Sequence, residues 1–240
     1  MILTLIVKKG YTNMIKERQD ASESCKQLSH LRGSSILSQT RTIKTSAETL
    51  ELRSFCPPSF VEELRADRGL CAFARLPERE HELLLKIAKR LDRVLTLAYT
   101  SSGEIVGQVT IVPCDGWWEG LENTYEIAIE VSSCWRRSGV ARELQMFSLE
   151  LDALEDVILQ AIGLSWHWDT EEVGLPSSRY RQLIARLFEP HDFMEYQTSE
   201  PNISSEPGNI LLVRIGSRVS QQNVGQFINR LLGSVDLSTM

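Results

Sequence analysis

The sequence of 240 residues lacks the cysteine and histidine patterns of a metal site. No two cysteines have the spacing of paired metal ligands, and the 4 histidines are scattered. We therefore expect no metal ion, and free thiols in a reducing cytosol. The 5 cysteines are Cys25, Cys56, Cys71, Cys114 and Cys134.

Long apolar runs are missing as well. The apolar start, Met1–Val7, is shorter than the apolar core of a secretory signal, and Lys8 and Lys9 follow it rather than precede it. Elsewhere no run approaches the roughly 18 apolar residues that span a bilayer. We expect a cytoplasmic protein that does not enter a membrane.

A surplus of positive charge is also absent, because the net charge is −6. Nucleic-acid-binding proteins usually present a basic surface, so we expect no nucleic-acid partner. Hydrophobic residues make up 42% of the chain and charged residues 24%, which is ordinary for a globular protein with a buried core.

Residues 1–45 differ in composition from the rest. Between Gly10 and Thr45 the chain is rich in Ser, Thr, Lys, Arg and Gln, and its apolar residues have no sustained period. The sequence therefore predicts a flexible or loosely attached extension over residues 1–45 and one domain over residues 46–240.

From Ala47 onward, some segments alternate as strands do and others repeat with the helical period. Mixed strands and helices indicate a layered α/β or α+β domain. The predicted order is a strand at 49–53, helices that open near Pro57 and at Pro77, strands at 94–99, 105–112 and 125–131, a helix to about 152, a strand at 157–162, a helix at 177–187, strands at 193–197 and 210–215, and a helix after Ser220.

A basic loop of small residues separates the strand that ends at Val131 from the next helix. The first turn of a helix leaves backbone N–H groups unpaired, and the helix dipole is positive at that end. Gly139 and Ala141 let an anion approach this backbone closely. The predicted phosphate cradle consists of Arg136, Arg137, Ser138, Gly139, Val140, Ala141 and Arg142.

The spacing Arg136-x-x-Gly139-x-Ala141, after an apolar strand, resembles the acyl-CoA loop of the GNAT superfamily of N-acetyltransferases. Two positions depart from the common pattern: Ser133 stands where many members have Pro, and Ala141 where they have a second Gly. The resemblance implies acetyl-CoA as the acyl donor. It also implies an α+β fold with a mixed, mostly antiparallel central sheet flanked by helices.

The second half of the chain contains an ordered series of further motifs. They are Trp166-His167-Trp168-Asp169, Tyr180-Arg181, Glu200 to Ser205, Val213 to Gly216, Val219-Ser220-Gln221 and Gln226-Phe227, with Leu70 to Pro77 upstream. From about Ala47 to Leu232 the chain resembles the acetoin-utilisation acetyltransferase (AcuA) family. That resemblance implies a protein lysine N-acetyltransferase. Members of the family acetylate the lysine with which acetyl-CoA synthetase makes its acyl-adenylate, and so inactivate that enzyme.

The GNAT resemblance also implies where the donor binds. In that fold the thioester arm pairs with the strand before the loop, so backbone groups of Ile129 and Val131 are the expected partners of the pantetheine and the acetyl oxygen. The N–H of Val131 would then polarise the thioester carbonyl, as an oxyanion donor does.

The same strand contains two carboxylates, Glu126 and Glu130, which share one face by the period of two. Amine acetylation needs a group that takes a proton from the amine, and a buried carboxylate is costly without a role or a partner. Glu126 is the first candidate for the general base, directly or through water, and Glu130 is the second. Either could instead form a salt bridge or be exposed at a splayed strand end.

Tyr180 is the candidate for an acid that protonates the departing thiolate. In the GNAT fold this acid is usually a Tyr near the end of the helix after the fifth strand, where this chain has Leu187 and Phe188. Tyr180 lies about two turns earlier, on the apolar stripe of its helix, which favours a role in the core or the substrate pocket. The thiolate can also leave unassisted.

Two aromatic segments are candidates for substrate binding. Trp117 and Trp118 lie in an acidic loop that commonly walls the acceptor groove in this fold, and such a wall suits a lysine side chain. Trp166 and His167 follow a strand near the expected end of the pantetheine. Both segments could instead only pack in the core, and the sequence does not favour a catalytic role for His167.

Two other functions remain open from the sequence. The acceptor could be a free amine or amino acid in place of a protein lysine. The chain could also bind acyl-CoA without transferring the acyl group and act as a regulatory module.

Overall fold

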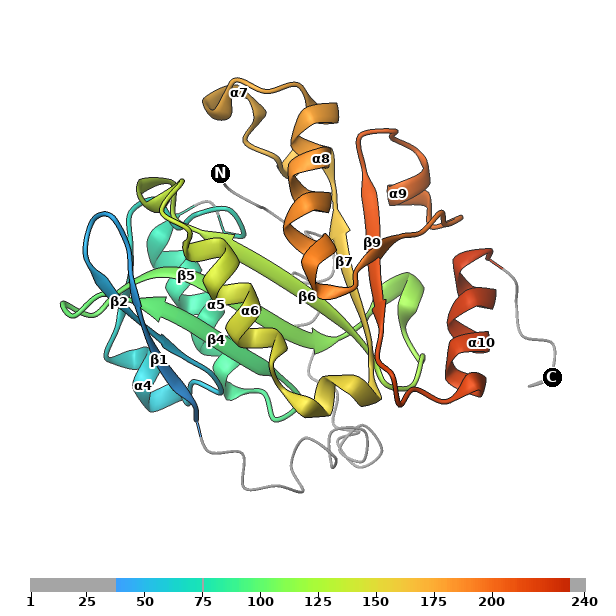
Figure 1. Ribbon diagram of the computed structural model, residues 1–240, viewed down its shortest axis with the longest axis horizontal. Coiled ribbons are helices and arrows are strands. Elements are labelled where there is room, and N and C mark those ends of the chain that lie inside the picture. Colours follow the sequence, from blue (N-terminus) through green and yellow to red (C-terminus); the bar gives the residue numbers. More distant parts are fainter. Residues whose placement is uncertain (1–37, 75, 234–240) are drawn as a thin grey trace. The chain divides into compact units, whose positions relative to one another are not determined.

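The computed structural model describes residues 38–74 and 76–233 (Figure 1). The strands in this part are β1 (Thr40–Lys44), β2 (Thr49–Arg53), β3 (Arg65–Ala66), β4 (Val94–Tyr99), β5 (Glu104–Pro113), β6 (Thr124–Val131), β7 (Ile158–Gly163), β8 (Met194–Glu195) and β9 (Ile210–Ile215). The helices are α4 (Pro58–Glu62), α5 (Pro77–Lys89), α6 (Val140–Leu149), α7 (Thr170–Val173), α8 (Ser177–Phe188), α9 (Pro201–Ser204) and α10 (Gln221–Leu231).

The described strands form one mixed, mostly antiparallel sheet of 9 strands, flanked by helices. The strand order is β1-β2-β4-β5-β6-β7-β9-β8, with β3 beside β5. This confirms the fold class that the GNAT resemblance implied. The long elements that periodicity predicted are all present.

The chain divides into two compact units. Of the described residues, the first unit holds 38–74, 76–112 and Ile127–Leu151, and the second holds Pro113–Glu126 and residues 152–233. Strand β6 therefore contributes its first residues to the second unit and its last residues to the first.

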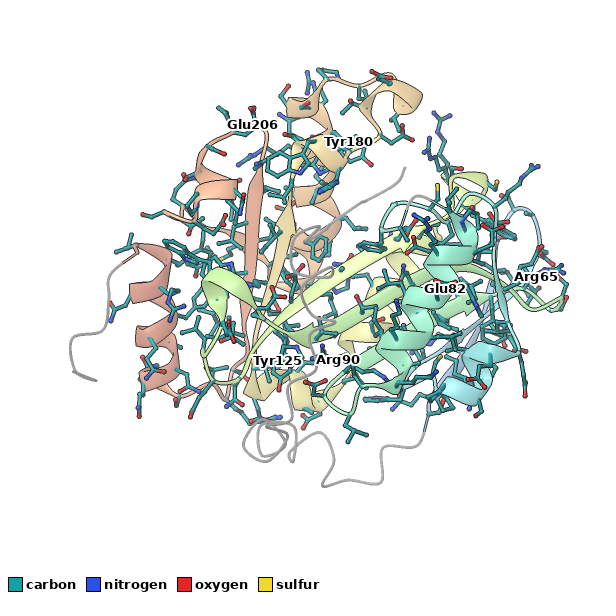
Figure 2. All side chains as sticks on the ribbon, turned by 180° about the vertical axis from the view of Figure 1, so that it is seen from behind. Arg65, Glu82, Arg90, Tyr125, Tyr180 and Glu206 are labelled. Atoms are coloured by element: carbon teal, nitrogen blue, oxygen red, sulfur yellow. The ribbon has the colours of Figure 1, made fainter. Side chains whose placement is uncertain are left out.

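In the first unit, β1, β2, β4 and β5 pair antiparallel in succession, and β3 pairs parallel with the start of β5. Strands β4 and β5 are buried along nearly their whole length, which explains their continuous apolar runs. Helix α5 lies on one face of these strands and α6 on the other (Figures 1 and 2).

The ends of α5 follow from its sequence. Pro77 fills the first helical position, where a missing N–H costs nothing. Glu78 and Glu80 in the first turn, and Lys86 and Lys89 in the last, complement the helix dipole.

The helical period predicts an apolar stripe of Val140, Leu144, Phe147 and Leu151 in α6, and one of Leu84, Ile87 and Leu91 in α5. The structure confirms the first and corrects the second. Val140, Leu144 and Phe147 of α6 are all buried, as the helical period predicts. Leu91, predicted on the stripe of α5, is instead 71% exposed. The reason is that the helix ends at Lys89 and the next residue is extended.

Strand β1 lies at the end of the predicted extension. Its residues pair with β2 from Thr40 opposite Arg53 to Lys44 opposite Thr49, and Ile43 is buried. This part of the extension is thus an edge strand and is not loosely attached. Residues 1–37 lie outside the described residues, so the division of the chain at residue 45 stays a prediction.

In the second unit, the start of β6 pairs parallel with β7, while β9 pairs antiparallel with both β7 and β8. Helix α8 buries Tyr180, Ile184 and Phe188, a seam with a spacing of four residues. The apolar core of this unit contains Trp118, Ile158, Ile162, Leu164, Ile203, Leu211, Val213, Phe227 and Leu231.

Helix α10 begins as the sequence predicts. The Ser220 side chain accepts a hydrogen bond of 3.2 Å from the N–H of Asn223, which caps the helix. The sequence did not predict β3, α7 or α9, which are too short to show a period. Within the described ranges no helix has the length and apolarity that a bilayer crossing requires.

Replacing Phe227 with Ala should lower the free energy of unfolding by about 3–5 kcal/mol. Its ring is fully buried and stacks on Trp118 with ring centroids 5.5 Å apart. Leu232→Ala is the control, because Leu232 is 65% exposed. Urea unfolding measures both variants, and equal stabilities would contradict this account of the core.

Candidate active site

The loop after β6 is organised by short-range hydrogen bonds. Residues Ser133–Trp135 form one 3-10 turn, and the Ser132 side chain accepts from the N–H of Cys134 at 3.1 Å to cap it. The Ser138 hydroxyl donates to the carbonyl of Trp135 at 2.5 Å. The loop therefore has a defined shape before any ligand binds.

The loop opens the N-terminus of α6. Arg137 and Gly139 both have left-handed backbones, with φ of 62° and 84°. Gly139 is the N-cap residue, and a Cβ built on it would meet no heavy atom within 4 Å. The first-turn N–H groups that follow, from Val140 and Ala141, have no partner within the helix and lie at its positive end.

Guanidinium groups surround this opening. Arg137 and Arg142 are exposed and Arg136 is half-buried. Arg68 joins them from another part of the chain, and its hydrogen bond with the Cys134 thiol raises the pKa of Arg68. Backbone donors, the helix dipole and several full positive charges make this a binding site for a polyanion.

The Asp67–Ala74 segment, which leads from β3 toward α5, packs against the loop. The Asp67 carboxylate accepts from the Ser132 hydroxyl and from the N–H of Gly69, the latter at 2.9 Å. The N–H of Ser133 donates to the carbonyl of Gly69 at 3.0 Å. A Cβ on Gly69 would lie 2.5 Å from the hydroxyl oxygens of Ser132 and Ser133, so only glycine allows this approach.

The sequence analysis included Leu70 to Pro77 among the family motifs, but it missed Arg68 and the contact between this segment and the loop. Both reach the loop from more than 60 residues earlier in the chain. Only the pairing of β3 with β5 brings them beside the end of β6.

The last part of β6 leads directly into the loop. The side chains of Ile129 and Val131 are buried, so these residues can offer a ligand only their backbone groups. The parallel register with β7 covers Thr124–Glu126, which precede them on the strand. Their assignment to the pantetheine remains a prediction that this placement allows.

Glu126 is a buried carboxyl group on β6, only 7% exposed. Burial, and then the nearby charge of Asp115, raises the pKa of Glu126 to about 8. It lies opposite Gln160 in the β6–β7 register, and Gln160 donates to the Cys114 sulfur at 3.0 Å. Among the described residues Glu126 forms no salt bridge, and its side chain does not lie at an exposed strand end.

Glu130, the second candidate base, is fully buried in a different environment. It accepts from the N–H of Ala72 at 2.7 Å and from the amide of Gln108 at 3.1 Å. The same Gln108 amide donates to Glu80 at 3.1 Å. Burial and then the charge of Glu80 raise the pKa of Glu130. Both of its oxygens are thus engaged by the protein itself.

Trp118 does not fit its predicted role in substrate binding. It is 3% exposed and belongs to the core of the second unit, because it stacks on Phe227. Trp117 is half-buried, and its indole N–H donates to the carbonyl of Arg230 at 3.1 Å. The two rings therefore anchor the loop to α10. Any contact that this loop makes with an acceptor would have to come from its other residues.

The second aromatic segment divides in the same way. Trp168 is buried and stacks on Tyr180, with ring centroids 5.2 Å apart and an interplanar angle of 15°. Trp166 is 53% exposed and donates from its indole N–H to Nε2 of His167 at 3.0 Å. The full burial of Tyr180 favours the packing role over the acid, whereas Trp166 and His167 remain available to a substrate.

The cysteines of the described ranges are free thiols, at Cys56, Cys71, Cys114 and Cys134. Cys25 lies outside the described residues. In the same ranges no group of three His, Cys, Asp or Glu side chains is arranged to hold a metal ion.

The fold and the loop define the class of protein. An apolar strand, an open basic loop and a helix N-terminus, set in a mixed and mostly antiparallel sheet, form the acyl-CoA-binding unit of the GNAT superfamily. The chain therefore has the fold and the loop that the sequence predicts for an acetyl-CoA-dependent N-acetyltransferase of this class.

Known proteins narrow the class to a family. The acetoin utilization protein AcuA of Bacillus subtilis (strain 168) is 32% identical over 190 residues, which cover 77% of this chain and 90% of that protein. AcuA of Bacillus licheniformis is 30% identical over 193 residues, covering 78% of this chain and 90% of the relative. No family model matches the chain.

A solved structure agrees with these relatives. The crystal structure of an acetoin utilization protein from Exiguobacterium sibiricum superimposes with a TM-score of 0.77 at 28% sequence identity. The match covers 83% of this chain and 97% of that one. The chain belongs to the AcuA family of acetoin utilization proteins.

Replacing Gly69 with Ala should weaken acetyl-CoA binding about tenfold or more, because the added methyl group must displace Ser132 and Ser133 and distort the loop. Gly225→Ala is the matched control, since a Cβ there meets nothing within 4 Å. Titration calorimetry gives both dissociation constants. An unchanged constant for Gly69→Ala would show that this segment does not shape the donor site.

Proposed function

We propose that this chain transfers the acetyl group of acetyl-CoA to a lysine side chain of a protein. We further propose that the acceptor is the catalytic lysine of acetyl-CoA synthetase and that its acetylation inactivates that enzyme. The observation behind the transfer is the open, basic start of α6 directly after β6. The choice of acceptor rests on membership of the AcuA family.

The proposed donor site uses the loop and the strand before it. The loop residues Arg136, Arg137, Ser138, Gly139, Val140, Ala141 and Arg142 would hold the pyrophosphate, with Arg68 as an additional cation. Backbone groups of Ile129 and Val131 would hold the pantetheine arm. Fixing the thioester in this way removes the entropy cost of aligning it with the amine.

The proposed chemistry is direct transfer. The lysine nitrogen, once neutral, attacks the thioester carbonyl carbon, and the N–C bond forms as the C–S bond breaks. Glu126 accepts the proton that the lysine ammonium loses, directly or through water. The N–H of Val131 would stabilise the negative charge on the carbonyl oxygen. CoA leaves as a thiolate and takes up, through solvent, the second proton that the attacking nitrogen loses as the amide forms.

The environment of Glu126 supports its role as the base. An ordinary glutamate has a pKa near 4.3 and is a weak base toward an ammonium group. Burial beside Asp115 raises the pKa of Glu126 to about 8, so its conjugate base binds a proton more strongly. Of the two candidates on β6, Glu126 is the one whose oxygens are not engaged by backbone N–H groups in the hydrogen bonds that the structure gives for the described residues.

Acidic and aromatic groups would recognise the acceptor. Asp115, Glu119 and Glu122 accompany the tryptophan loop, and their charges would attract a lysine. Trp166, which is 53% exposed, would add an aromatic surface, with His167 hydrogen-bonded beside it.

The base should be visible in the pH dependence. A carboxylate acts as a base only when deprotonated, so kcat/KM should rise with pH and level off above a pKa of about 8. Glu126→Gln should lower kcat/KM at high pH by about 10²–10⁴-fold and remove this rise. Glu206→Gln, an exposed change in the same unit (Figure 2), is the control. An unaltered rate in Glu126→Gln would remove Glu126 from the mechanism.

The acceptor is tested with acetyl-CoA labelled in the acetyl group. Acetyl-CoA synthetase should become labelled and lose activity, and a synthetase with Arg in place of its catalytic lysine should not become labelled. Label on small amines alone would instead show a small-molecule acetyltransferase. Tight binding of acetyl-CoA with no transfer to either would show a regulatory module.

A further inference from the structure

A pair of carboxyl groups, from Glu80 and Glu130, lies fully buried in the first unit. Glu80 comes from the first turn of α5 and Glu130 from the end of β6. One amide nitrogen, Nε2 of Gln108 on β5, donates to both carboxyl groups at 3.1 Å. Three different elements, α5, β5 and β6, thus meet at this cluster.

The remaining partners of the pair are backbone N–H groups of the Asp67–Ala74 segment. Ala72 donates to Glu130 at 2.7 Å, and Ala74 donates to Glu80 at 2.8 Å. The segment therefore has no regular ladder at these residues and depends on two carboxyl groups for its position.

The contacts have a consistent direction. Gly69 contacts Ser133, just after β6, and Ala72 contacts Glu130. A step of three residues forward along the segment thus corresponds to three residues backward along β6. The segment thus runs back along the end of β6, from the phosphate loop toward the middle of the strand. This is the stretch of β6 that contains Val131, the proposed oxyanion donor.

We propose that Glu80 and Glu130 share one proton and that this hydrogen-bonded pair fixes the Asp67–Ala74 segment as a wall of the acetyl-transfer site. Glu130 is then a positioning residue and not the general base. The role of the segment as a wall of the acetyl-transfer site rests on the proposed function, whereas the shared proton of the pair does not.

The surroundings of the pair require a shared proton. Two ionised carboxylates side by side in a buried site repel each other strongly, so one of them is protonated. Burial is the largest cause that raises the pKa of each, and each carboxyl forms a hydrogen bond with the other. Among the described residues, the other groups that face them are Gln108 and the N–H groups of Ala72, Phe73 and Ala74, all of them neutral.

The sign of the pH dependence follows. A carboxyl whose folded-state pKa is raised keeps its proton to a higher pH than it does in the unfolded chain. Between the unfolded-state pKa and the folded-state pKa, folding therefore takes up a proton. The wall is therefore intact below the raised pKa of the pair. As the pH rises through the raised pKa of the pair, the second charge forms and the segment is released.

Amide hydrogen exchange of the free protein tests the pair without any substrate. The N–H groups of Ala72 and Ala74 should be protected below the pKa of the pair and lose about tenfold or more of that protection, after correction for intrinsic exchange, as the pH rises through it. In Glu130→Gln the amide mimics the protonated carboxyl, so protection should persist to higher pH. Glu82→Gln, an exposed change on the same helix (Figure 2), should follow the wild type.

Kinetics then test the wall. Glu130→Ala should raise KM for the acceptor about tenfold, because a released segment no longer shapes the site, and Glu130→Gln should restore most of this loss. Glu80→Gln is measured alongside Glu130→Gln, so that the pair can still be tested if one of the two variants does not fold. A large fall in kcat for Glu130→Gln with normal protection would make Glu130 the base and overturn the proposal.

The two proposals fail in distinguishable ways. If the wild type transfers no acetyl group, the proposed function is wrong, yet the exchange experiment still reports on the pair. If transfer occurs but Ala72 and Ala74 exchange equally fast in wild type and Glu130→Ala, the pair does not hold the segment and this inference is wrong.

Discussion

The turn from β6 into α6 is the constraint on which the active site depends. Gly139 adopts a left-handed backbone at the N-cap of α6, where a Cβ would meet no heavy atom within 4 Å. The N–H groups of the first helical turn follow it without partners inside the helix. These donors are fixed by the helix and need no reorganisation when an anion arrives. The Asp67–Ala74 segment holds the start of the same turn through Ser132 and Ser133. Bulk at Gly139, or a shift at Gly69, would therefore disturb the donor site itself.

Strand β6 shows how the surroundings give two similar side chains different roles. Glu126 and Glu130 share one face of the strand, and both are buried with raised pKa values. Glu130 meets Glu80, Gln108 and backbone donors, which leaves it occupied within the protein. Burial and the charge of Asp115 raise the affinity of Glu126 for a proton. In the hydrogen bonds of the described residues, no backbone N–H group donates to Glu126. The protein can thus devote one carboxyl to structure and one to chemistry.

The sequence was sufficient wherever the signal is local. The helical stripe of α6, the cap at Ser220 and the small, basic loop before α6 are all encoded within a few residues. The Asp67–Ala74 segment could not be predicted, because its partners lie about 60 residues away and appear only once β3 pairs with β5. Trp118 was misassigned for the same reason, since the ring that buries it belongs to α10.

Acetyl-CoA binding by Gly139→Glu, measured by titration calorimetry, tests the central claim most directly. Gly139→Asn is the matched control, because Asn tolerates the left-handed backbone and adds no charge. The account predicts that the Glu variant, with bulk and negative charge at the open helix start, loses measurable binding while the Asn variant retains it. Equal affinity of the wild type and Gly139→Glu would contradict the assignment of this loop to the donor.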